Sequence, residues 1–322
     1  MRVSVVVPTF KRPDMLERCL SALLAQNFPP ADYEILIVDD AASTLTQQQV
    51  EECVTQNATH TIRYIAATGD VHGPAAARNR GWRAAQGKII AFTDDDCIPD
   101  PYWLQAGVAA FSGSVAGVAG RIIVPLGPDP TDYEYNASHL AQSEFVTANC
   151  FYIRDFLSAM GGFDECFTAP WREDSDLFFT LIEHGAGYAF EPEAVVVHPV
   201  RPAAWGVSIQ QQRKSMFNAL LYKKHPTLYR QRIQAAPPWH YYRIMGALFV
   251  AVLGLCRGSR PLALGGLGAW AYLTGRFCAL RLQRTSHAPK HIAEMVVTSA
   301  LLPPLSLYWR WRGMLKFRVF FL

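Results

Sequence analysis

The first hundred residues alternate short apolar runs with segments of helical periodicity, and this alternation constrains the fold more than any other feature. Four apolar runs are expected to be strands: Val3–Val7, Glu34–Val38, Ile62–Ile65 and Lys88–Phe92. Three helices are expected between them: one opening at Pro13 and Asp14, then Gln47–Gln56 and Pro74–Gln86. Strands that alternate with helices pair in parallel through crossovers. The pattern predicts an α/β fold with a Rossmann-like open sheet, which binds ligands where its strands end.

The pattern loosens between residues 100 and 199. Further strands are expected at Val115–Val124, Ala148–Ile153 and Ala194–Val197. The segment Pro125–Tyr135 is rich in Pro and Asp and is expected to be a loop. Leu177, Phe178, Leu181 and Ile182 form a helical stripe that ends at Gly185.

Charge divides the chain into two regions that the net charge of +3 conceals. Residues 1–199 carry 12 Lys and Arg against 26 Asp and Glu, whereas residues 200–322 carry 18 against the single Glu294. An acidic region suits metal or cation chemistry, and a basic apolar region suits an anionic lipid surface or nucleic acid. We therefore expect a catalytic domain over 1–200, with a nucleotide-binding half over 1–100 and an acceptor half over 101–200, and a helical region over 201–322.

The C-terminal region contains a basic amphipathic segment, Ile209–Lys224, that is expected to be a helix. Three uncharged runs of 13, 15 and 15 residues follow, Ile244–Cys256, Pro261–Gly275 and Met295–Trp309. A membrane crossing takes roughly 20 apolar residues, so these lengths favour interfacial or re-entrant helices. A packed soluble helical subdomain and true spanning helices remain the alternatives. The seven scattered cysteines fit a reducing compartment, and a strand-like run directly after Arg2 indicates no signal peptide.

The strongest chemical signal is Asp94-Asp95-Asp96 directly after an expected strand. Three adjacent carboxylates repel one another unless a compensating charge or full solvation stabilises them. Hard oxygen ligands of this kind hold Mg²⁺ or Mn²⁺ against phosphates, although an acidic helix cap is the alternative. A second pair, Asp39-Asp40, also follows a strand, where it could accept from a ribose hydroxyl or a base N–H, or cap a helix.

Two more segments carry candidate functional residues. The run from His72 to Gly81 joins a glycine turn to a helix start with Arg78 and Arg80, which suits a pyrophosphate contacted by one of the two arginines. Glu173-Asp174 opens the helix that carries Leu177, so the pair is either a favoured helix start or a source of a general base. His198 could be a metal ligand or a core histidine.

Taken together, these segments resemble the family 2 glycosyltransferases of the GT-A fold over about residues 1–200. The matching segments, in the family's order, are Val5–Arg12, Val38–Asp40, Ala75–Gly81, Asp94–Pro99, Gly161–Glu165 and Glu173–Leu177. The resemblance implies a nucleotide-sugar donor and sugar transfer with inversion. It also implies a divalent cation, Mn²⁺ or Mg²⁺, on the donor diphosphate.

The resemblance implies roles for individual residues. Seven residues are expected to contact the nucleotide, and Asp39 among them is expected to accept from the base N–H. They are Pro8, Thr9, Arg12, Asp39, Arg78, Asp94 and Asp95. Asp94 and Asp96 match the outer acids of the family's DxD motif and are expected metal ligands. His198 is added to them as a candidate ligand because of its place after the last expected strand, and not because of the resemblance. Asp174 matches the catalytic base, supported by Glu173, and Gly161–Asp164 resembles the turn beneath the sugar and acceptor.

The chain departs from the family pattern at two places. Ala41-Ala42-Ser43 replaces the frequent Gly-Ser after the Asp pair, and Gln210–Lys214 lacks the tryptophan of the processive motif Gln-x-x-Arg-Trp. We therefore expect one sugar to be added per encounter. No GxGxxG follows the first strand, which disfavours a dehydrogenase.

Three hypotheses follow. The first is an inverting, metal-dependent transferase at the cytoplasmic face of the plasma membrane, which extends a lipid-linked glycan or glycolipid for surface polysaccharide. The second is a polyprenyl-phosphate sugar synthase. The third is a non-catalytic peripheral membrane or nucleic-acid-binding module, although the apolar runs suit lipid better than a phosphate backbone, so no nucleic-acid partner is expected. The basic region could also form a homodimer.

Overall fold

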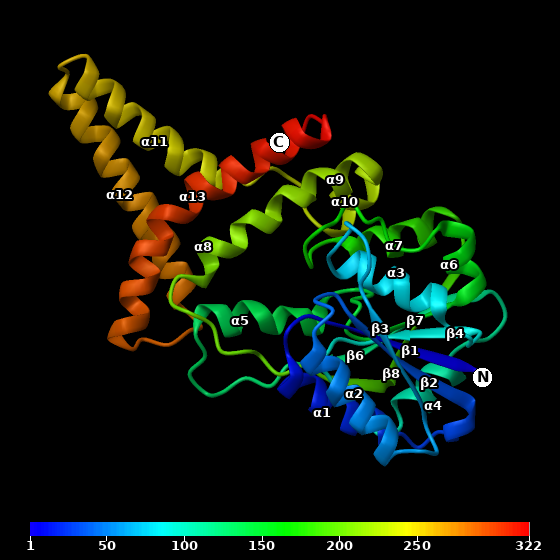
Figure 1. The fold of residues 1–322 in the computed structure, drawn as a ribbon. Coiled ribbons are helices and arrows are strands. Elements are labelled where there is room, and N and C mark those ends of the chain that lie inside the picture. The colour runs from blue at the N-terminus through cyan, green and yellow to red at the C-terminus, as the bar shows by residue number, and fades with distance from the viewer. Residues whose placement is uncertain (322) are drawn as a thin grey trace. The chain divides into compact units, whose positions relative to one another are not determined.

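The computed structural model describes residues 1–321, which form two compact units (Figure 1). The first unit comprises Met1–Pro125 and His139–Val200. The second comprises Leu126–Ser138 and the residues from Arg201 onward. The chain therefore leaves the first unit once in its middle, as well as at residue 200.

An eight-stranded mixed sheet forms the framework of the first unit, in the order β3-β2-β1-β4-β7-β6-β8-β5. The strands are β1 (Val3–Thr9), β2 (Tyr33–Asp39), β3 (Thr61–Ala66), β4 (Ile89–Phe92), β5 (Ile98–Pro99), β6 (Val115–Ile123), β7 (Cys150–Ile153) and β8 (Gly187–Val197). The first four are mutually parallel, as the alternation predicts. β7 pairs antiparallel with both β4 and β6, and β5 pairs antiparallel with β8. The expected α/β fold is confirmed, and its second half is mixed rather than parallel.

Helices cover this sheet and bury its apolar side chains. They are α1 (Pro13–Leu24), α2 (Thr44–Gln56), α3 (Pro74–Ala84), α4 (Trp103–Ala109), α6 (Arg154–Met160) and α7 (Glu173–Glu183), with short 3₁₀ turns η1 (Pro30–Asp32) and η2 (His139–Gln142). Every residue of β2 is buried, as expected for a strand covered on both faces. α3 lies directly on β1, because a Cβ atom on Gly81 would overlap the side chain of Val6.

The second unit is helical. Its elements are α5 (Asp132–Ser138), α8 (Val207–Gln211), η3 (Gln212–Met216), α9 (Phe217–Lys224), α10 (Pro226–Arg232), α11 (Trp239–Cys256), α12 (Arg260–Leu282) and α13 (Pro289–Phe317). The single helix expected over Ile209–Lys224 is wrong, since the structure divides it among α8, η3 and α9. At the end of η3 the backbone of Met216 packs against Gly313 of α13, where a Cβ would overlap the Met216 carbonyl. Packing against a distant helix therefore overrides the local helical pattern.

The segment expected to be a loop, Pro125–Tyr135, contains the start of α5. Thr131 and Glu134 form a capping box, in which Glu134 Oε2 accepts from the Thr131 backbone N–H (2.7 Å) and hydroxyl (2.9 Å). Asp132 then forms a buried ion pair with Arg281 of α12 (Nη2 to Oδ2, 2.7 Å). Arg281 also donates to the hydroxyls of Thr298 and Ser299 in α13, so one guanidinium joins three helices of the second unit.

Candidate active site

Parallel strands β1, β2 and β4 end at the same edge of the sheet, and the predicted site residues gather there. Thr9 and Asp39 are paired in register at the ends of β1 and β2. The backbone N–H of Thr93 donates to the Val6 carbonyl (3.4 Å), which places the following aspartates beside the end of β1. The topology therefore brings together residues that are more than 80 positions apart in the sequence.

Each carboxylate of the Asp94–Asp96 cluster has a different polar partner. Asp94 Oδ1 accepts from Arg78 Nη2 at 2.6 Å. Asp95 is buried and accepts from Thr9 Oγ1 (2.8 Å) and Arg12 Nη1 (3.1 Å). Burial raises the pKa of Asp95, and the charge of Arg12 opposes that rise. The repulsion expected among three adjacent anions is thus offset in part by two arginines and a hydroxyl.

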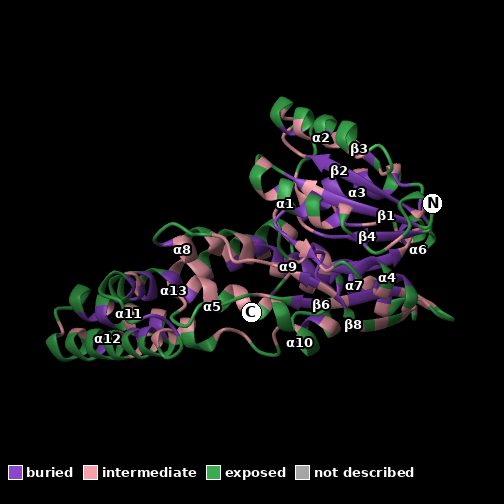
Figure 2. Cartoon of the chain, turned by 90° about the horizontal axis from the view of Figure 1, so that it is seen from below, coloured by how far each residue is buried: buried purple, intermediate pink, exposed green. Residues whose placement is uncertain are grey.

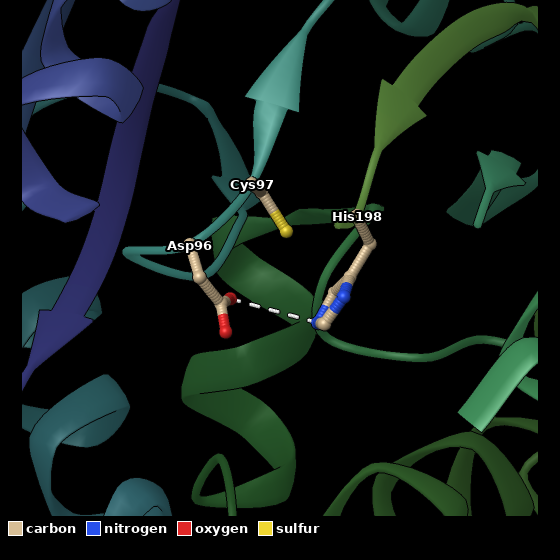
Figure 3. Close-up of side chains that lie close together, drawn as sticks. All are labelled: Asp96, Cys97 and His198. Atoms are coloured by element: carbon tan, nitrogen blue, oxygen red, sulfur yellow. Dashed lines mark ion pairs between the residues drawn. The ribbon is translucent and has the colours of Figure 1, made fainter. Parts of the chain in front are cut away.

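Asp96 lies beside His198, with 3.5 Å between Oδ1 and Nε2 (Figure 3). The pairing of β5 with β8 sets Ile98 opposite Val197. Cys97, which precedes β5, and His198, which follows β8, therefore lie close together. The ligand atoms of Asp96, Cys97 and His198 all lie within 4.8 Å of one another. A carboxylate oxygen suits Mn²⁺ or Mg²⁺, whereas an imidazole nitrogen suits a transition metal better than Mg²⁺. Burial raises the pKa of the Cys97 thiol well above its usual value, and a neutral thiol is a poor ligand for either cation.

Arg78 is buried and bridges two acids. Its Nη2 contacts Asp94, and its Nη1 contacts Glu173 Oε1 at 3.1 Å. The Arg78 and Glu173 side chains are each 4 % exposed, so their contact is shielded from water, whereas Asp94 is 27 % exposed. Arg78 is thereby placed to hold the Asp94 and Glu173 carboxylates in position, and its expected contact with the nucleotide stays a prediction.

Glu173 and Asp174 begin α7 immediately after Arg172, which adopts the left-handed conformation at φ 78°. Burial and the neighbouring Asp174 charge raise the pKa of Glu173 to about 7, while Arg78 opposes the rise. Burial also raises the pKa of Asp174, against the Ser175 N–H that donates to its Oδ1 at 2.6 Å. Near neutral pH a fraction of Glu173 is protonated, which lessens repulsion of a charged Asp174. A carboxylate with a raised pKa is a stronger base than an ordinary one.

The other predicted nucleotide contacts lie along the ends of β1 and β2. Asp39 is fully buried, and its oxygens accept from the backbone N–H groups of Ala41 (2.9 Å) and Ser43 (2.7 Å) and from Tyr64 Oη (3.0 Å). It therefore orders the turn that departs from the family pattern, while its role toward a base remains a prediction. Pro8 is half-buried, and Thr9 is buried with its hydroxyl on Asp95.

Asp40 ties this edge to the loop before α3. It accepts from the Gly73 backbone N–H at 2.9 Å and lies 3.1 Å from His72 Nδ1 and 3.5 Å from Arg80 Nη1. Gly73 has φ 114°, and a Cβ there would come within 2.9 Å of the Thr168 carbonyl oxygen. The glycine turn predicted from the sequence is thus required both by its backbone conformation and by its close packing.

Sequence reasoning missed the role of Asn79, which follows Arg78 on α3. Its buried amide donates to the Phe163 carbonyl and to Glu165 Oε1, both at 2.8 Å. Its oxygen accepts from the Phe163 N–H (2.9 Å) and from Trp82 Nε1 (2.8 Å). Asn79 therefore fixes the turn Gly161–Glu165. An asparagine inside a motif otherwise made of small residues and arginines was the available signal.

Solved structures share this fold. A mannosyltransferase, PcManGT from Pyrobaculum calidifontis, solved with GDP-Man and Mn²⁺, aligns with a TM-score of 0.59 at 19% identity, over 98% of this chain and 87% of that one. Residues 1–349 of S. aureus TarS, solved with UDP-GlcNAc, align with a TM-score of 0.53 at 15% identity, over 97% and 92%. At these identities the likeness concerns the fold.

The relatives found by sequence comparison are also glycosyltransferases. Glycosyltransferase AglE of Haloferax volcanii is 27% identical over 62% of this chain and 67% of its own length. Validoxylamine A glucosyltransferase of Streptomyces hygroscopicus subsp. limoneus is 24% identical over 70% and 57%. Pre-mycofactocin glycosyltransferase of Mycobacterium tuberculosis is 30% identical over 62% and 43%. The matches therefore span only part of each relative.

The mixed sheet that this chain shares with these solved structures is that of the GT-A fold. The sequence pattern of the family described as "Glycosyl transferase family 2" matches residues 4–166, half of the chain. The chain belongs to this family, as the order of its motifs predicted.

Proposed function

We propose that the chain transfers a sugar, with inversion and with the aid of a divalent cation, from a nucleotide-sugar to a hydroxyl of a lipid-linked glycan or glycolipid in surface polysaccharide synthesis. The observation that carries the proposal is that buried Arg78 joins the aspartate cluster after β4 to the carboxylate pair Glu173-Asp174 at the start of α7. The Arg78 guanidinium contacts Asp94 and Glu173, and Asp96 of the aspartate cluster lies beside His198. The donor we expect is a UDP-sugar.

The residues divide the chemistry between two places. Asp96 and His198, with Asp94, would hold Mn²⁺ or Mg²⁺. The bound cation would supply positive charge to the departing diphosphate. Asp174 takes the proton from the attacking acceptor hydroxyl, and Glu173 supports it. A single displacement with base and leaving group on opposite sides inverts the anomeric carbon, so separate sites for the two tasks are what this reaction requires.

The neighbours and the helices of the second unit support the remaining parts of the proposal. PcManGT and TarS were solved with nucleotide-sugars bound, and PcManGT with Mn²⁺. α11 and α13 are long and apolar enough to cross a membrane. A basic region that bears such helices suits an anionic membrane surface. We place the chain at the cytoplasmic face of the plasma membrane, where nucleotide-sugars are made.

Substitution of the two groups tests the proposal. Asp96→Asn removes a carboxylate of the cation pair, and Asp174→Asn removes the base. Each should lower kcat by about 10²-fold or more, measured as transfer from UDP-sugars with Mn²⁺ to extracted lipid acceptors. Asp155→Asn, on the exposed surface of α6, is the matched control and should leave the rate unchanged. Turnover retained in both site variants, with folding intact, would contradict the mechanism.

The same Asp174→Asn variant separates hydroxyl transfer from the alternative of a polyprenyl-phosphate sugar synthase. A phosphate acceptor is already an anion and needs no base. Full activity of the variant toward a polyprenyl phosphate would therefore favour the synthase. Loss of transfer to a hydroxyl acceptor, with no activity toward the phosphate, would favour our proposal.

A further inference from the structure

Helices α11 and α12 of the second unit form an antiparallel hairpin, and glycine and alanine lie at their contact near the turn. A Cβ on Gly254 would overlap the backbone of Ala263, and a Cβ on Gly266 would overlap the backbone of Ala251. The two helices therefore pack backbone against backbone at two successive levels. Close packing through glycine and alanine is how helices associate in lipid, where burial of large apolar side chains supplies no driving force.

The outer surface of this hairpin is apolar. Phe249 and Leu255 of α11 are 66% and 72% exposed, and Leu264 and Tyr272 of α12 are 69% and 70% exposed. Figure 2 shows exposed residues along most of α12, where the buried ones are Gly266, Thr274 and Cys278. A surface helix in water carries polar residues on its exposed side. Here the exposed side is the more apolar one.

Apolar side chains face outward on both flanks. At about 100° per residue, Leu267 and Tyr272 are five positions apart and so point about 140° away from each other around α12. Leu267 is 50% exposed. A hairpin lying flat on a membrane would bury one of these flanks and leave the other in water.

Arginines bound the apolar band at both ends. Arg257 and Arg260 lie at the turn, and Arg243 and Arg276 lie at the opposite end; all four are exposed. The contacts of Gly254 with Ala263 and of Gly266 with Ala251 set the register, which brings Arg243 and Arg276 to a similar level. The uncharged runs between the arginines, of 13 and 15 residues, are about 20 and 22 Å long.

We propose that α11 and α12 cross the lipid bilayer as a hairpin, with the arginines of the turn at the far headgroup layer. The hydrocarbon core is about 30 Å thick, and long arginine side chains with local thinning of the bilayer can accommodate the shorter band. Partial insertion would instead leave Arg257 and Arg260 in hydrocarbon, which is unfavourable. The inference deepens the membrane association in the proposed function and rests on it. It also replaces the interfacial or re-entrant arrangement that run length alone favoured.

By length and mean hydropathy alone, α11 and α13 could cross a membrane and α12 falls short, yet α13 differs from the hairpin in the residues that it buries. Its buried side includes His291, Thr298, Ser299 and Arg310, and Gly313 packs against η3. These polar groups bind partners within the second unit, such as Arg281. We therefore assign the crossing to the hairpin and leave α13 outside it.

The distribution of basic residues gives the crossing a direction. Two arginines lie at the turn. Nine Lys and Arg flank the other end of the hairpin: Lys223, Lys224, Arg230, Arg232, Arg243, Arg276, Arg281, Arg284 and Lys290. Segments rich in Lys and Arg stay on the cytoplasmic side. The turn should consequently face the opposite side of the membrane.

Cysteine labelling of the full chain tests the crossing. Bacterial cells would express variants in which Cys53, Cys166 and Cys256 are serine, since these are the cysteines that are not buried. Two variants are made in this background. Ser259→Cys places a cysteine at the turn, and Gln283→Cys, just after α12, is the matched control. In intact spheroplasts a membrane-impermeant maleimide should label position 259 and not position 283, and permeabilisation should expose both. Labelling of neither position before permeabilisation, or of position 283 alone, would overturn the proposal.

A second measurement needs no new cysteine. The double variant Leu264→Lys/Leu267→Lys adds two charges to exposed positions of the band, and should shift the membrane-to-soluble ratio after carbonate extraction by at least about a hundredfold. The control Leu45→Lys, at a 57% exposed leucine of α2, should leave the membrane-to-soluble ratio unchanged. Binding of UDP with Mn²⁺, followed by thermal shift, should be equal in all three proteins. Loss of UDP binding in every protein would count against the proposed function and not the hairpin. Wild-type chain recovered as a carbonate-soluble dimer would overturn the hairpin.

Discussion

At the scale of single residues, the site depends on how one buried arginine is shared. Arg78 contacts Asp94 at 2.6 Å and Glu173 at 3.1 Å, and the side chains of Arg78 and Glu173 are each 4 % exposed. Glu173 Oε2 is buried without a hydrogen-bond partner among the described residues. One guanidinium therefore offsets only part of the cost of burying this carboxylate, which explains why its pKa rises to about 7.

The raised pKa of Glu173 predicts a pH dependence of stability. The folded pKa of about 7 exceeds the ordinary 4.5, so the folded state binds this proton more tightly than the unfolded state. The stabilisation that protonated Glu173 gives the folded state is complete below about pH 4.5 and is lost as pH rises through 7. The free energy of unfolding changes by about 3 kcal/mol over this range. Glu173→Gln cannot lose a proton, so its unfolding free energy relative to wild type should increase over this range. Denaturant titrations between pH 5 and 8 measure it, with exposed Glu52→Gln as control; parallel curves would contradict the assignment.

At the scale of elements, α3 connects the parts of the site. Arg78 reaches the acids after β4 and at the start of α7, while Asn79 holds the turn Gly161–Glu165. Gly162 in that turn has φ 78°, and a Cβ there would lie 2.5 Å from Asn79 Oδ1. The helix and the turn are thus fitted to each other, and displacement of one moves the other.

Asn79→Ala should loosen that turn. The change leaves the Phe163 backbone groups and Trp82 Nε1 buried without the partner that Asn79 supplied, so we expect a loss of about 3 kcal/mol in unfolding free energy. If the turn supports sugar and acceptor, KM for the acceptor should rise more than KM for the donor. Asn57→Ala, whose amide is half-buried and bonds locally to the Cys53 carbonyl, is the control. Unchanged stability would show that Asn79 does not hold the turn.

The elements that sequence could predict are those whose signals are local. Buried runs such as Val3–Val7 and the stripe of α7 identify strands and helices because periodicity reflects burial of a single face. The break at η3 could not be predicted, since Gly313, about a hundred residues away, imposes it. The α5 start at Thr131-x-x-Glu134 carried a recognisable capping signal that Pro and Asp nearby obscured.

The same limit applies to the site. Sequence identified the acids because three adjacent aspartates at a strand end are rarely needed for folding. It could not pair Arg78 with Glu173 or Asp96 with His198, because strand order and the β5–β8 pairing bring these residues together. Of the two arginines considered for the nucleotide, Arg80 donates to the loop carbonyls of Thr68 and Val71 and Arg78 contacts two acids, so the nucleotide contact stays a prediction.

At the scale of the whole molecule, the acidic and basic regions of the sequence are not simply the two units. Leu126–Ser138 belongs to the second unit and brings Asp129, Asp132 and Glu134 to a region that otherwise has the single acid Glu294. Asp132 is the one that pairs with buried Arg281. The segment Leu126–Ser138 thus supplies the negative charge that the basic helices of the second unit lack.

Removal of that countercharge should destabilise the helical unit. Asp132→Ala leaves Arg281 buried without its anion, which typically costs about 3–5 kcal/mol. Calorimetry of the full chain should show a lower transition temperature, and Asp132→Ala/Arg281→Met should recover part of the loss. Asp129→Asn neutralises an exposed acid of the same segment and should have little effect. Equal transitions for Asp132→Ala and Asp129→Asn would refute the role of the ion pair.

The segment Leu126–Ser138, between β6 and β7, also determines how such a chain can be divided or recombined. Because the chain passes from one unit to the other at residues 125, 138 and 200, a cut after Val200 does not separate them cleanly. A fragment ending there would keep α5 but lose α12, which carries its ion-pair partner. Exchange of the helical unit between related genes would therefore succeed only if the segment 126–138 were inherited with it.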